Sequence, residues 1–247
     1  MNEKRFQFLN IHIDNLTMAE SIQAIDNMII KGGIHYVVTP NVDHIIKLED
    51  DAEFREVYDN ADLILTDGMP LIWISKLKKT PIKERVSGSD LFPLVCQLAS
   101  QKGYSIFLLG AAEGVSENAS KILQQTYKNI NIVGTFSPNI GFENNKTDIN
   151  VIIQMIKNAK PDILAIGLGA PKQEKFIYKY KDILQVPVSL GIGASIDFIS
   201  GNIKRAPKWM QKNGLEWFFR FLKEPRRMFI RYFIKDLKII SIVRKYW

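Results

Sequence analysis

Asp67 combines a residue type and a position that suit acid–base chemistry. It stands in the segment "LILTDGMP", after an apolar run and just before Gly68 and Pro70. A carboxylate that follows a buried strand can face a ligand crevice and accept a proton from a hydroxyl group. The alternative is that Asp67 caps a helix that begins near Pro70. The spacing alone does not decide between the two.

A second polar group follows another apolar run, in the segment "GLGAPKQEKFI". Gly167 and Gly169 end the run, Pro171 is expected at the first position of a helix, and Lys172 and Gln173 come next. The amide of Gln173 can both donate and accept hydrogen bonds, which suits sugar hydroxyls or a diphosphate. A cap or a surface pair is the simpler alternative for one of these side chains.

Three further candidates lie in short segments rich in small residues. Arg85 in "KERVSGSD" can hold a phosphate through two hydrogen bonds, and Asp197 in "GASIDF" can contact a ribose or base, or else cap a helix. Gly110 opens "GAAEG", which resembles half of a dinucleotide-binding loop. The complete G-x-G-x-x-G fingerprint is missing, which disfavours an NAD-dependent oxidoreductase.

The sequence offers no obvious metal site. His12, His35 and His44 are scattered, and the acidic segment "LEDDAEF" is expected to be the solvated face of a helix. No D-x-D pattern follows an expected strand. We therefore expect metal-independent chemistry without a cofactor.

The elements that position these residues alternate between short apolar runs and helical patterns. Near-continuous apolar runs are typical of strands buried on both faces, and strand–helix alternation predicts a parallel sheet. We predict an α/β fold, a Rossmann-like and mostly parallel sheet with flanking helices, preceded by a strand or hairpin at 5–14. Ser89, Asp90 and Ser116 are expected near helix starts. The expected strands are 35–40, 62–67, 104–110, 131–136, 161–169 and 186–194, and the expected helices are 41–60, 89–102, 113–128, 147–159 and 171–182.

Charge divides the 247 residues into two parts. The net charge is +7, but residues 204–247 carry +10 and residues 1–203 carry −3. We therefore expect a body at 1–203 and a helical, basic and aromatic appendage at 204–247. The single Cys96 excludes an internal disulfide and fits a reducing compartment. The first residues lack the apolar stretch of a secretory signal, and no run of about 18 apolar residues predicts a membrane-spanning helix.

The appendage holds ten of the 26 aromatic residues as well as the excess positive charge. A regular helix from Pro225 would place basic residues on one stripe and apolar residues opposite, which is typical of a helix lying on an anionic membrane. Each basic residue near such a surface contributes about 1 kcal/mol. The alternative is a helix packed on the body, and nucleic acid is disfavoured because no recognition motif accompanies the charge. The two stripes are Arg227, Arg231, Lys235, Lys238 and Lys245, and Phe229, Phe233, Leu237 and Ile240.

Taken in order, these motifs resemble the WecG/TagA/CpsF glycosyltransferases, glycosyltransferase family 26. The resemblance covers about residues 8–231, and its most specific parts are "GAPKQE" and "RAP…GLEW…R…EP". It implies inverting, metal-independent transfer of an N-acetylmannosamine-type sugar from UDP to GlcNAc on undecaprenyl diphosphate, in wall teichoic acid or related polysaccharide synthesis. It also implies a cytoplasmic enzyme, peripheral on the inner face of the cell membrane. Its motifs are "TPNVD", "TDGMP", "ERVSGSDL", "FLLGAAEGV", "GLGAPKQEKFI", "GIGASIDFISG" and "RAPKWMQKNGLEWFFRFLKEPRR".

The resemblance also assigns roles residue by residue. Asp67 matches the general base, and Arg85 and Gln173 match residues at the reaction centre. Thr39 and Asn41 match residues that line the sugar pocket. Asp197 matches a residue near the nucleoside, and Gly110, Lys172 and Arg231 are also expected to bind substrate.

The match is less complete in two places. Arg220 and Arg227 match arginines that engage the acceptor diphosphate, but Ile230 occupies the place of a third, with Arg231 next to it. Phe142 in "NIGFEN" takes the place of a tyrosine expected to stack on uracil. Another UDP-sugar donor, such as the uronic acid form or a hexose, and a membrane-associated nucleotide-binding protein without turnover stay open, as does a homo-oligomer.

Overall fold

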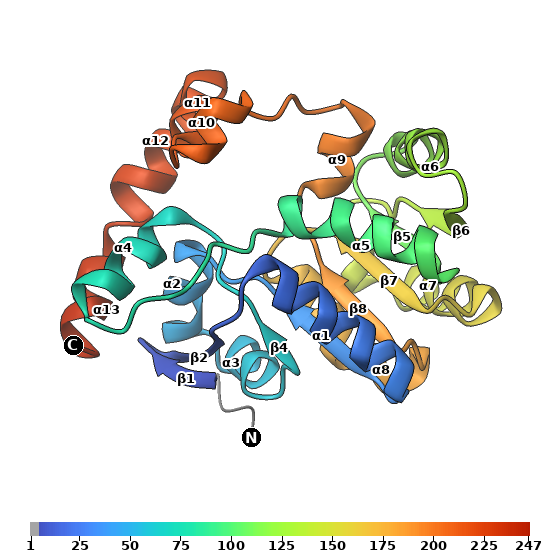
Figure 1. Cartoon of the computed structure of the whole chain (residues 1–247), viewed down its shortest axis with the longest axis horizontal. Helices are drawn as coiled ribbons and strands as arrows, with labels where there is room; N and C mark the ends of the chain where they lie inside the picture. Colours follow the sequence, from blue (N-terminus) through green and yellow to red (C-terminus); the bar gives the residue numbers. More distant parts are fainter. Residues whose placement is uncertain (1–4) are drawn as a thin grey trace.

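The computed structural model describes residues 5–247, apart from the side chain of Lys212. Its centre is a six-stranded sheet in the order β4-β3-β8-β7-β5-β6, and each neighbouring pair is parallel (Figure 1). Each of the six expected strands is present, so the predicted α/β fold is confirmed. The strands are β3 His35–Val38, β4 Leu63–Ile64, β5 Ser105–Gly110, β6 Asn131–Phe136, β7 Ile163–Gly167 and β8 Val188–Gly191.

Helices cover both faces of this sheet because successive strand residues point to opposite sides. Val37 packs in one core cluster, while its neighbours Tyr36 and Val38 pack in the other. The helices that bury residues in the Val37 cluster are α1 Met18–Lys31, α5 Gly88–Lys102, α6 Val115–Thr126 and α9 Ser195–Ser200. Those on the Tyr36 side include α2 Val42–Asp50, α3 Ala52–Asp59, α4 Met69–Leu77, α7 Lys146–Ala159 and α8 Lys172–Leu184.

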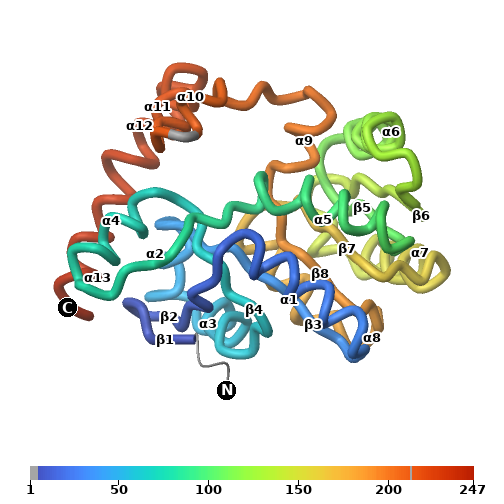
Figure 2. Tube along the Cα trace, viewed as in Figure 1, coloured from blue at the N-terminus to red at the C-terminus, as the bar shows by residue number. Residues whose placement is uncertain are grey.

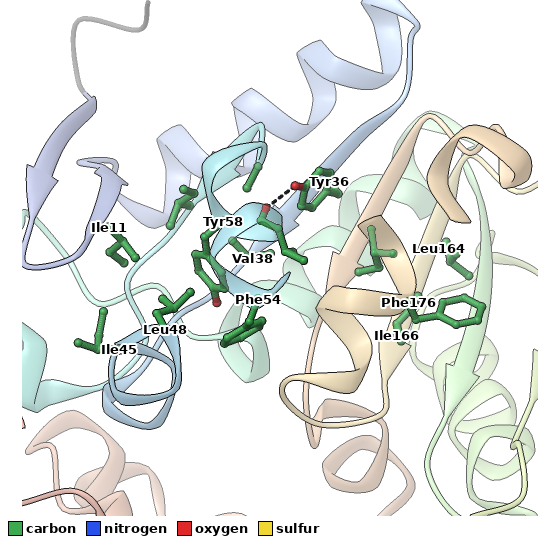
Figure 3. Close-up of a cluster of buried hydrophobic side chains, with 14 of the residues drawn as sticks. Ile11, Tyr36, Val38, Ile45, Leu48, Phe54, Tyr58, Leu164, Ile166 and Phe176 are labelled. Atoms are coloured by element: carbon green, nitrogen blue, oxygen red, sulfur yellow. Dashed lines mark hydrogen bonds between the residues drawn. The ribbon is translucent and has the colours of Figure 1, made fainter. Parts of the chain in front are cut away.

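The Tyr36 side of the core contains an aromatic pair within α3 and a hydrogen bond between α3 and the sheet (Figure 3). The rings of Phe54 and Tyr58 meet edge to face with centroids 5.1 Å apart. The hydroxyl of Tyr36 donates a hydrogen bond to the carbonyl of Val57, and this bond holds α3 against β3. These contacts hold in place β3, the strand that leads to Asn41.

The predicted N-terminal hairpin is present and covers the edge of the sheet. Strands β1 Arg5–Phe8 and β2 Ile11–Asp14 pair antiparallel. The carboxylate of Asp14 accepts hydrogen bonds from Arg5 Nη2 at 2.7 Å and from the backbone N–H of Ile64 at 2.8 Å. Asp14 thereby satisfies a backbone donor of the edge strand β4, which would otherwise be free to pair with another chain.

Helix starts differ from the sequence expectation by one to two residues. The N-cap of α5 is Ser87, whose hydroxyl accepts a hydrogen bond from the N–H of Asp90, so Ser89 and Asp90 lie inside the helix. Ser116 lies in the first turn of α6, after Gly114. Pro171 precedes α8 rather than opening it. In the sequence, each short polar residue near a helix start could be the N-cap residue. The backbone conformation in the structure shows which of them is the cap.

The C-terminal appendage is a series of short helices that returns along α4 Met69–Leu77 and α2 (Figure 2). The single regular helix predicted from Pro225 is wrong. A π-helical turn, in which the N–H of Asp236 bonds to the carbonyl of Arg231, inserts a residue and rotates everything that follows. The two stripes therefore do not form, since Arg231 faces a cavity and Lys245 pairs with Glu49 at 2.7 Å. The segments are α10 Lys208–Lys212, α11 Glu216–Lys223, α12 Pro225–Ile230, the turn η2 Arg231–Lys235 and α13 Lys238–Lys245.

The end of the appendage packs on the body, as the alternative interpretation predicted. Ile242 is buried within the Tyr36-side core cluster, and α13 contacts α2. The backbone of Gly214 lies against the side chain of Met69, leaving no room there for a Cβ atom. Many other apolar side chains of the appendage remain exposed, among them Trp209 and Phe229. Across residues 5–247, no helix is long and apolar enough to cross a membrane.

Candidate active site

A cavity of about 410 Å³ lies where the carboxyl ends of β3 and β4 meet the appendage. Five residues singled out from the sequence line it together: Asn41, Asp67, Arg85, Arg220 and Arg231. The first three come from loops that follow or adjoin the strands, and the two arginines come from α11 and η2. Ligands of open parallel sheets bind at this edge, so the cavity is the candidate active site.

Asp67 is held at the entrance to α4 without acting as its cap. Its N–H donates to the carbonyl of Pro40 at 2.8 Å, and Gly68 is the N-cap residue, with φ of 102°. The start of α4 has no side-chain capping hydrogen bond, so the capping alternative for Asp67 is wrong. Burial raises the pKa of the Asp67 carboxyl to about 6, although Arg85 and Arg220 act in the opposite direction. A carboxylate with this pKa is suited to accepting a proton near neutral pH.

Three arginines and two carboxylates form an ion network beside Asp67. Asp90 accepts a hydrogen bond from Arg85 and forms an ion pair with Arg205, with both N···O distances at 2.7 Å. Glu216 lies 3.2 Å from Arg205 and 3.6 Å from both Arg85 and Arg220. Arg85 is therefore held by Asp90, whereas the ion pair of Arg220 with Glu216 is longer, which leaves Arg220 able to turn to an anionic ligand.

Sequence reasoning did not single out Arg205, Asp90 or Glu216. Arg205 and Glu216 stand in the quoted motif "RAPKWMQKNGLEW", and Asp90 was considered only as a helix start. Their ion pairs join α5 to the appendage across more than 100 residues of sequence, so no local spacing shows them.

Arg231, the second appendage arginine in the cavity lining, has a side-chain donor without a hydrogen-bond partner among the described residues. Its Nε and the Oδ1 of Asp236 are both buried and find no hydrogen-bond partner within the described part of the chain. Burial raises the pKa of Asp236, although the charge of Arg231 acts in the opposite direction. Buried donors without partners are costly, which is a reason to expect a ligand there.

A buried hydrogen-bond network runs from the cavity to the end of β8. His44 Nδ1 lies 2.9 Å from Asn41 Oδ1, and His44 Nε2 lies 3.3 Å from Glu174 Oε1. Glu174 also accepts from Gln173 Nε2 at 2.7 Å, and Gln173 Oε1 accepts from the N–H of Gly193 at 3.1 Å. Gln173 therefore lies behind the cavity wall, and its amide ties the start of α8 to the loop after β8.

The remaining sequence candidates lie outside the cavity lining. Thr39 is buried, and its hydroxyl donates to the carbonyl of Gly191 at 3.5 Å. Lys172 pairs with Glu143, Asp197 accepts from Asn202 at 2.9 Å, and Arg227 pairs with Glu224 at 2.6 Å. A Cβ atom on Gly110 would lie 2.4 Å from the carbonyl oxygen of Gly167 in β7, so this glycine lets two strand ends approach.

Phe142 lies in a different environment from the one its predicted role requires. It is only 4% exposed and meets Phe176 edge to face with centroids 6.1 Å apart. A ring that stacks on a base needs a free face, and this ring is enclosed by the core instead. The predicted uracil contact through Phe142 is therefore not supported. Its burial could not be read from a segment that looks like a polar loop.

Two of the three histidines, His35 and His44, each contact one carboxylate. His35 lies 2.9 Å from Asp62, and His44 bonds Glu174 as described. Over residues 5–247, no group of three or more His, Cys, Asp or Glu side chains is arranged to hold a metal ion.

A carboxyl group with a raised pKa, set among arginines at the carboxyl ends of parallel strands, matches the chemistry of a sugar-transferring enzyme. The model of the WecG/TagA/CpsF glycosyl transferase family matches residues 6–247. The chain belongs to this family and is a glycosyltransferase.

Three relatives show the range of similarity, and all three are named N-acetylglucosaminyldiphosphoundecaprenol N-acetyl-beta-D-mannosaminyltransferase. The protein of Bacillus subtilis (strain 168) is 35% identical over 72% of this chain and 67% of its own length. That of Bacillus spizizenii (strain W23) is 32% identical over 78% and 72%. That of Staphylococcus aureus (strain MW2) is 28% identical over 92% and 88%.

Proposed function

We propose that this enzyme transfers N-acetylmannosamine from UDP-ManNAc to GlcNAc carried on undecaprenyl diphosphate, in the synthesis of a bacterial surface polysaccharide. The observation that carries the proposal is Asp67, a carboxyl group with a pKa of about 6 in a cavity that three arginines line. The names of the relatives support the sugar and the acceptor.

In the proposed reaction, Asp67 removes the proton from the acceptor hydroxyl of GlcNAc. The hydroxyl oxygen attacks C1 of the donor sugar on the face opposite UDP, and the bond from C1 to the diphosphate oxygen breaks. The electron pair leaves with UDP, so one displacement inverts the configuration at C1. The proton rests on Asp67 until it passes to solvent.

In this proposal, arginine side chains, rather than a metal ion, stabilise the negative charge of the donor and acceptor diphosphates. Arg85 and Arg220 lie close enough to Asp67 to lower its pKa, so they are placed where charge develops on the leaving group. Arg231 supplies a buried donor without a partner among the described residues, which suits the acceptor diphosphate.

The appendage is proposed to hold the enzyme on an anionic membrane, at the inner face where the lipid acceptor would be reached. Its net charge of +10 supports this, as do exposed apolar side chains such as Trp209, Phe229 and Ile234. Because the two predicted stripes do not form, the contact relies on scattered basic and aromatic groups instead of one amphipathic helix.

The direct test is sugar transfer to a water-soluble GlcNAc-diphosphate lipid analogue, with a panel of UDP-sugars as donors. Asp67→Asn keeps the size of the side chain but removes the proton acceptor, so turnover should fall by roughly 10²–10⁴-fold. UDP-sugar binding, measured by calorimetry, should change little. Glu224→Gln is the matched control, because Glu224 is exposed and pairs only with Arg227 among the ion pairs described.

Two results would contradict the proposal. Unchanged turnover in Asp67→Asn would remove Asp67 as the base. Loss of turnover in EDTA, restored by Mg²⁺ or Mn²⁺, would remove the metal-independent assignment. Preference for a different UDP-sugar would keep the reaction type and replace the donor.

A further inference from the structure

The cavity that holds Asp67 is mostly apolar beyond its charged residues. Its apolar lining comes from two walls that are distant in sequence, one from the body and one from the appendage. The body wall consists of Val42, Met69, Pro70 and Trp73, and the appendage wall consists of Trp217, Tyr232, Phe233, Leu237, Ile239 and Ile240.

The body wall leads away from the reactive carboxyl along α4. Asp67 and Gly68 lie at the start of this helix, Met69 and Pro70 follow in its first turn, and Trp73 lies one turn further. One helical turn advances about 5.4 Å. Along this wall, the lining therefore changes from charged to apolar with increasing distance from Asp67.

The apolar walls are open rather than closed on each other. Trp73 is 51% exposed, Leu237 is 52% exposed and Ile240 is 50% exposed, although each lines the cavity. Large apolar groups that flank a cavity and stay exposed indicate that an apolar ligand covers them.

We propose that this apolar part of the cavity is a subsite for the isoprene units next to the diphosphate of the acceptor. The inference rests on the proposed function, in which the acceptor is a polyprenyl diphosphate. Arginines together with aliphatic and aromatic walls complement a ligand whose anionic diphosphate is joined directly to a hydrocarbon chain. A free nucleotide or sugar carries no hydrocarbon chain to cover these walls.

In this proposal, the isoprene units bind to protein side chains, so their binding does not require a membrane. The isoprenes lie between α4 and the appendage, so they contribute to acceptor affinity in plain solution. Burial of one five-carbon unit is expected to strengthen binding by at least about tenfold, since each buried CH₂ contributes about 0.8 kcal/mol.

The first experiment measures binding without turnover. Farnesyl diphosphate and inorganic diphosphate are titrated into the full chain in detergent-free buffer, below the concentration at which the prenyl ligand forms micelles. Trp73 and Trp217 line the cavity, so tryptophan fluorescence reports occupancy. Farnesyl diphosphate should bind at least about tenfold more tightly than inorganic diphosphate. Equal affinity would overturn the subsite.

Variants then locate the contact. Trp73→Ala and Leu237→Ala should each lower the preference for farnesyl over inorganic diphosphate by several-fold. Both side chains are half exposed, so neither change empties a buried core site. Trp209→Ala is the control, because Trp209 is an exposed tryptophan of the appendage that does not line the cavity. An equal loss of preference in the control would also overturn the proposal.

Turnover separates this inference from the proposed function. GlcNAc-diphosphate acceptors that carry a farnesyl or a methyl group are compared by KM with the wild-type chain. A lower KM for the farnesyl acceptor supports the subsite, while equal KM values with turnover on both reject it and leave the reaction standing. If neither acceptor reacts, the proposed function fails, and the diphosphate binding preference still decides whether the apolar subsite exists.

Discussion

At the scale of single residues, the raised pKa of Asp67 lowers the stability of the fold but suits the proton transfer proposed for this carboxyl group. Its carboxyl titrates at about 6 in the folded chain because of burial, against about 3.9 in an unfolded chain. Between pH 4 and 6 the folded state holds a proton that the unfolded state has lost. Unfolding then releases a proton, so the contribution of Asp67 makes the fold less stable as pH rises through this window and is constant above it.

This titration gives a paired prediction for activity and stability. Turnover of the wild-type enzyme should fall about tenfold per pH unit well below pH 6, because the base becomes protonated. Asp67→Asn should melt at a higher temperature than the wild type above pH 6, and the difference should shrink towards pH 4. Thermal melts of both chains at several pH values check this, and a difference independent of pH would contradict it.

Two arginines of the appendage were assigned the same role from the sequence, and the structure separates them. Arg220 lines the cavity and contacts Glu216, while Arg227 pairs with Glu224 outside it. Arg220→Ala should lower turnover by roughly 10²-fold or more, in the range found for loss of a charge-stabilising donor. Arg227→Ala serves as its matched control and should change turnover by less than a few-fold on a water-soluble acceptor. Equal losses would show that the appendage closes further during the reaction.

At the scale of elements, Gly110 allows the ends of β5 and β7 to lie close together. Gly110 has φ of 121°, and its Cα approaches the end of β7 so closely that a Cβ atom would meet the Gly167 carbonyl. Gly110→Ala should therefore reduce the free energy of unfolding by about 1–3 kcal/mol through strain and overlap. Gly103→Ala, also at positive φ but with open space around it, is the control for strain alone. Urea denaturation measures both, and equal losses would contradict the contact.

The elements themselves were largely predictable, because apolar runs of strand length mark strands that are buried on both faces. Parallel pairing then brings Asn41, Asp67 and Arg85 to one edge, as expected. The sequence could not show that Gln173 lies behind the wall, because this depends on Glu174 and His44 meeting across α8 and α2. It also could not show the π-helical turn at Arg231–Lys235, since the spacing of basic residues fits a regular helix equally well.

At the scale of the whole molecule, body and appendage share one site. Asn41, Asp67 and Arg85 come from the body, whereas Glu216, Arg220 and Arg231 come from the appendage. The core is shared through one end of the appendage, where Ile242 is buried in the Tyr36-side cluster and Ile239, Val243 and Tyr246 are partly buried against it. The appendage therefore completes the lining of the candidate site and covers one side of the core.

Truncation after Gly201 tests this division. The shortened chain keeps β1 to β8 and both core clusters except Ile242. It also loses the partly buried Ile239, Val243 and Tyr246, so its free energy of unfolding should be lower than that of the full chain. It should nevertheless unfold cooperatively and still bind UDP in calorimetry, yet transfer no sugar, since the cavity loses one wall and two arginines. It should also fail to sediment with anionic liposomes, whereas the full chain should sediment less as salt screens its +10 appendage. If the truncated chain does not fold, the aromatic residues of the appendage are needed by the body, and the division into body and appendage is wrong.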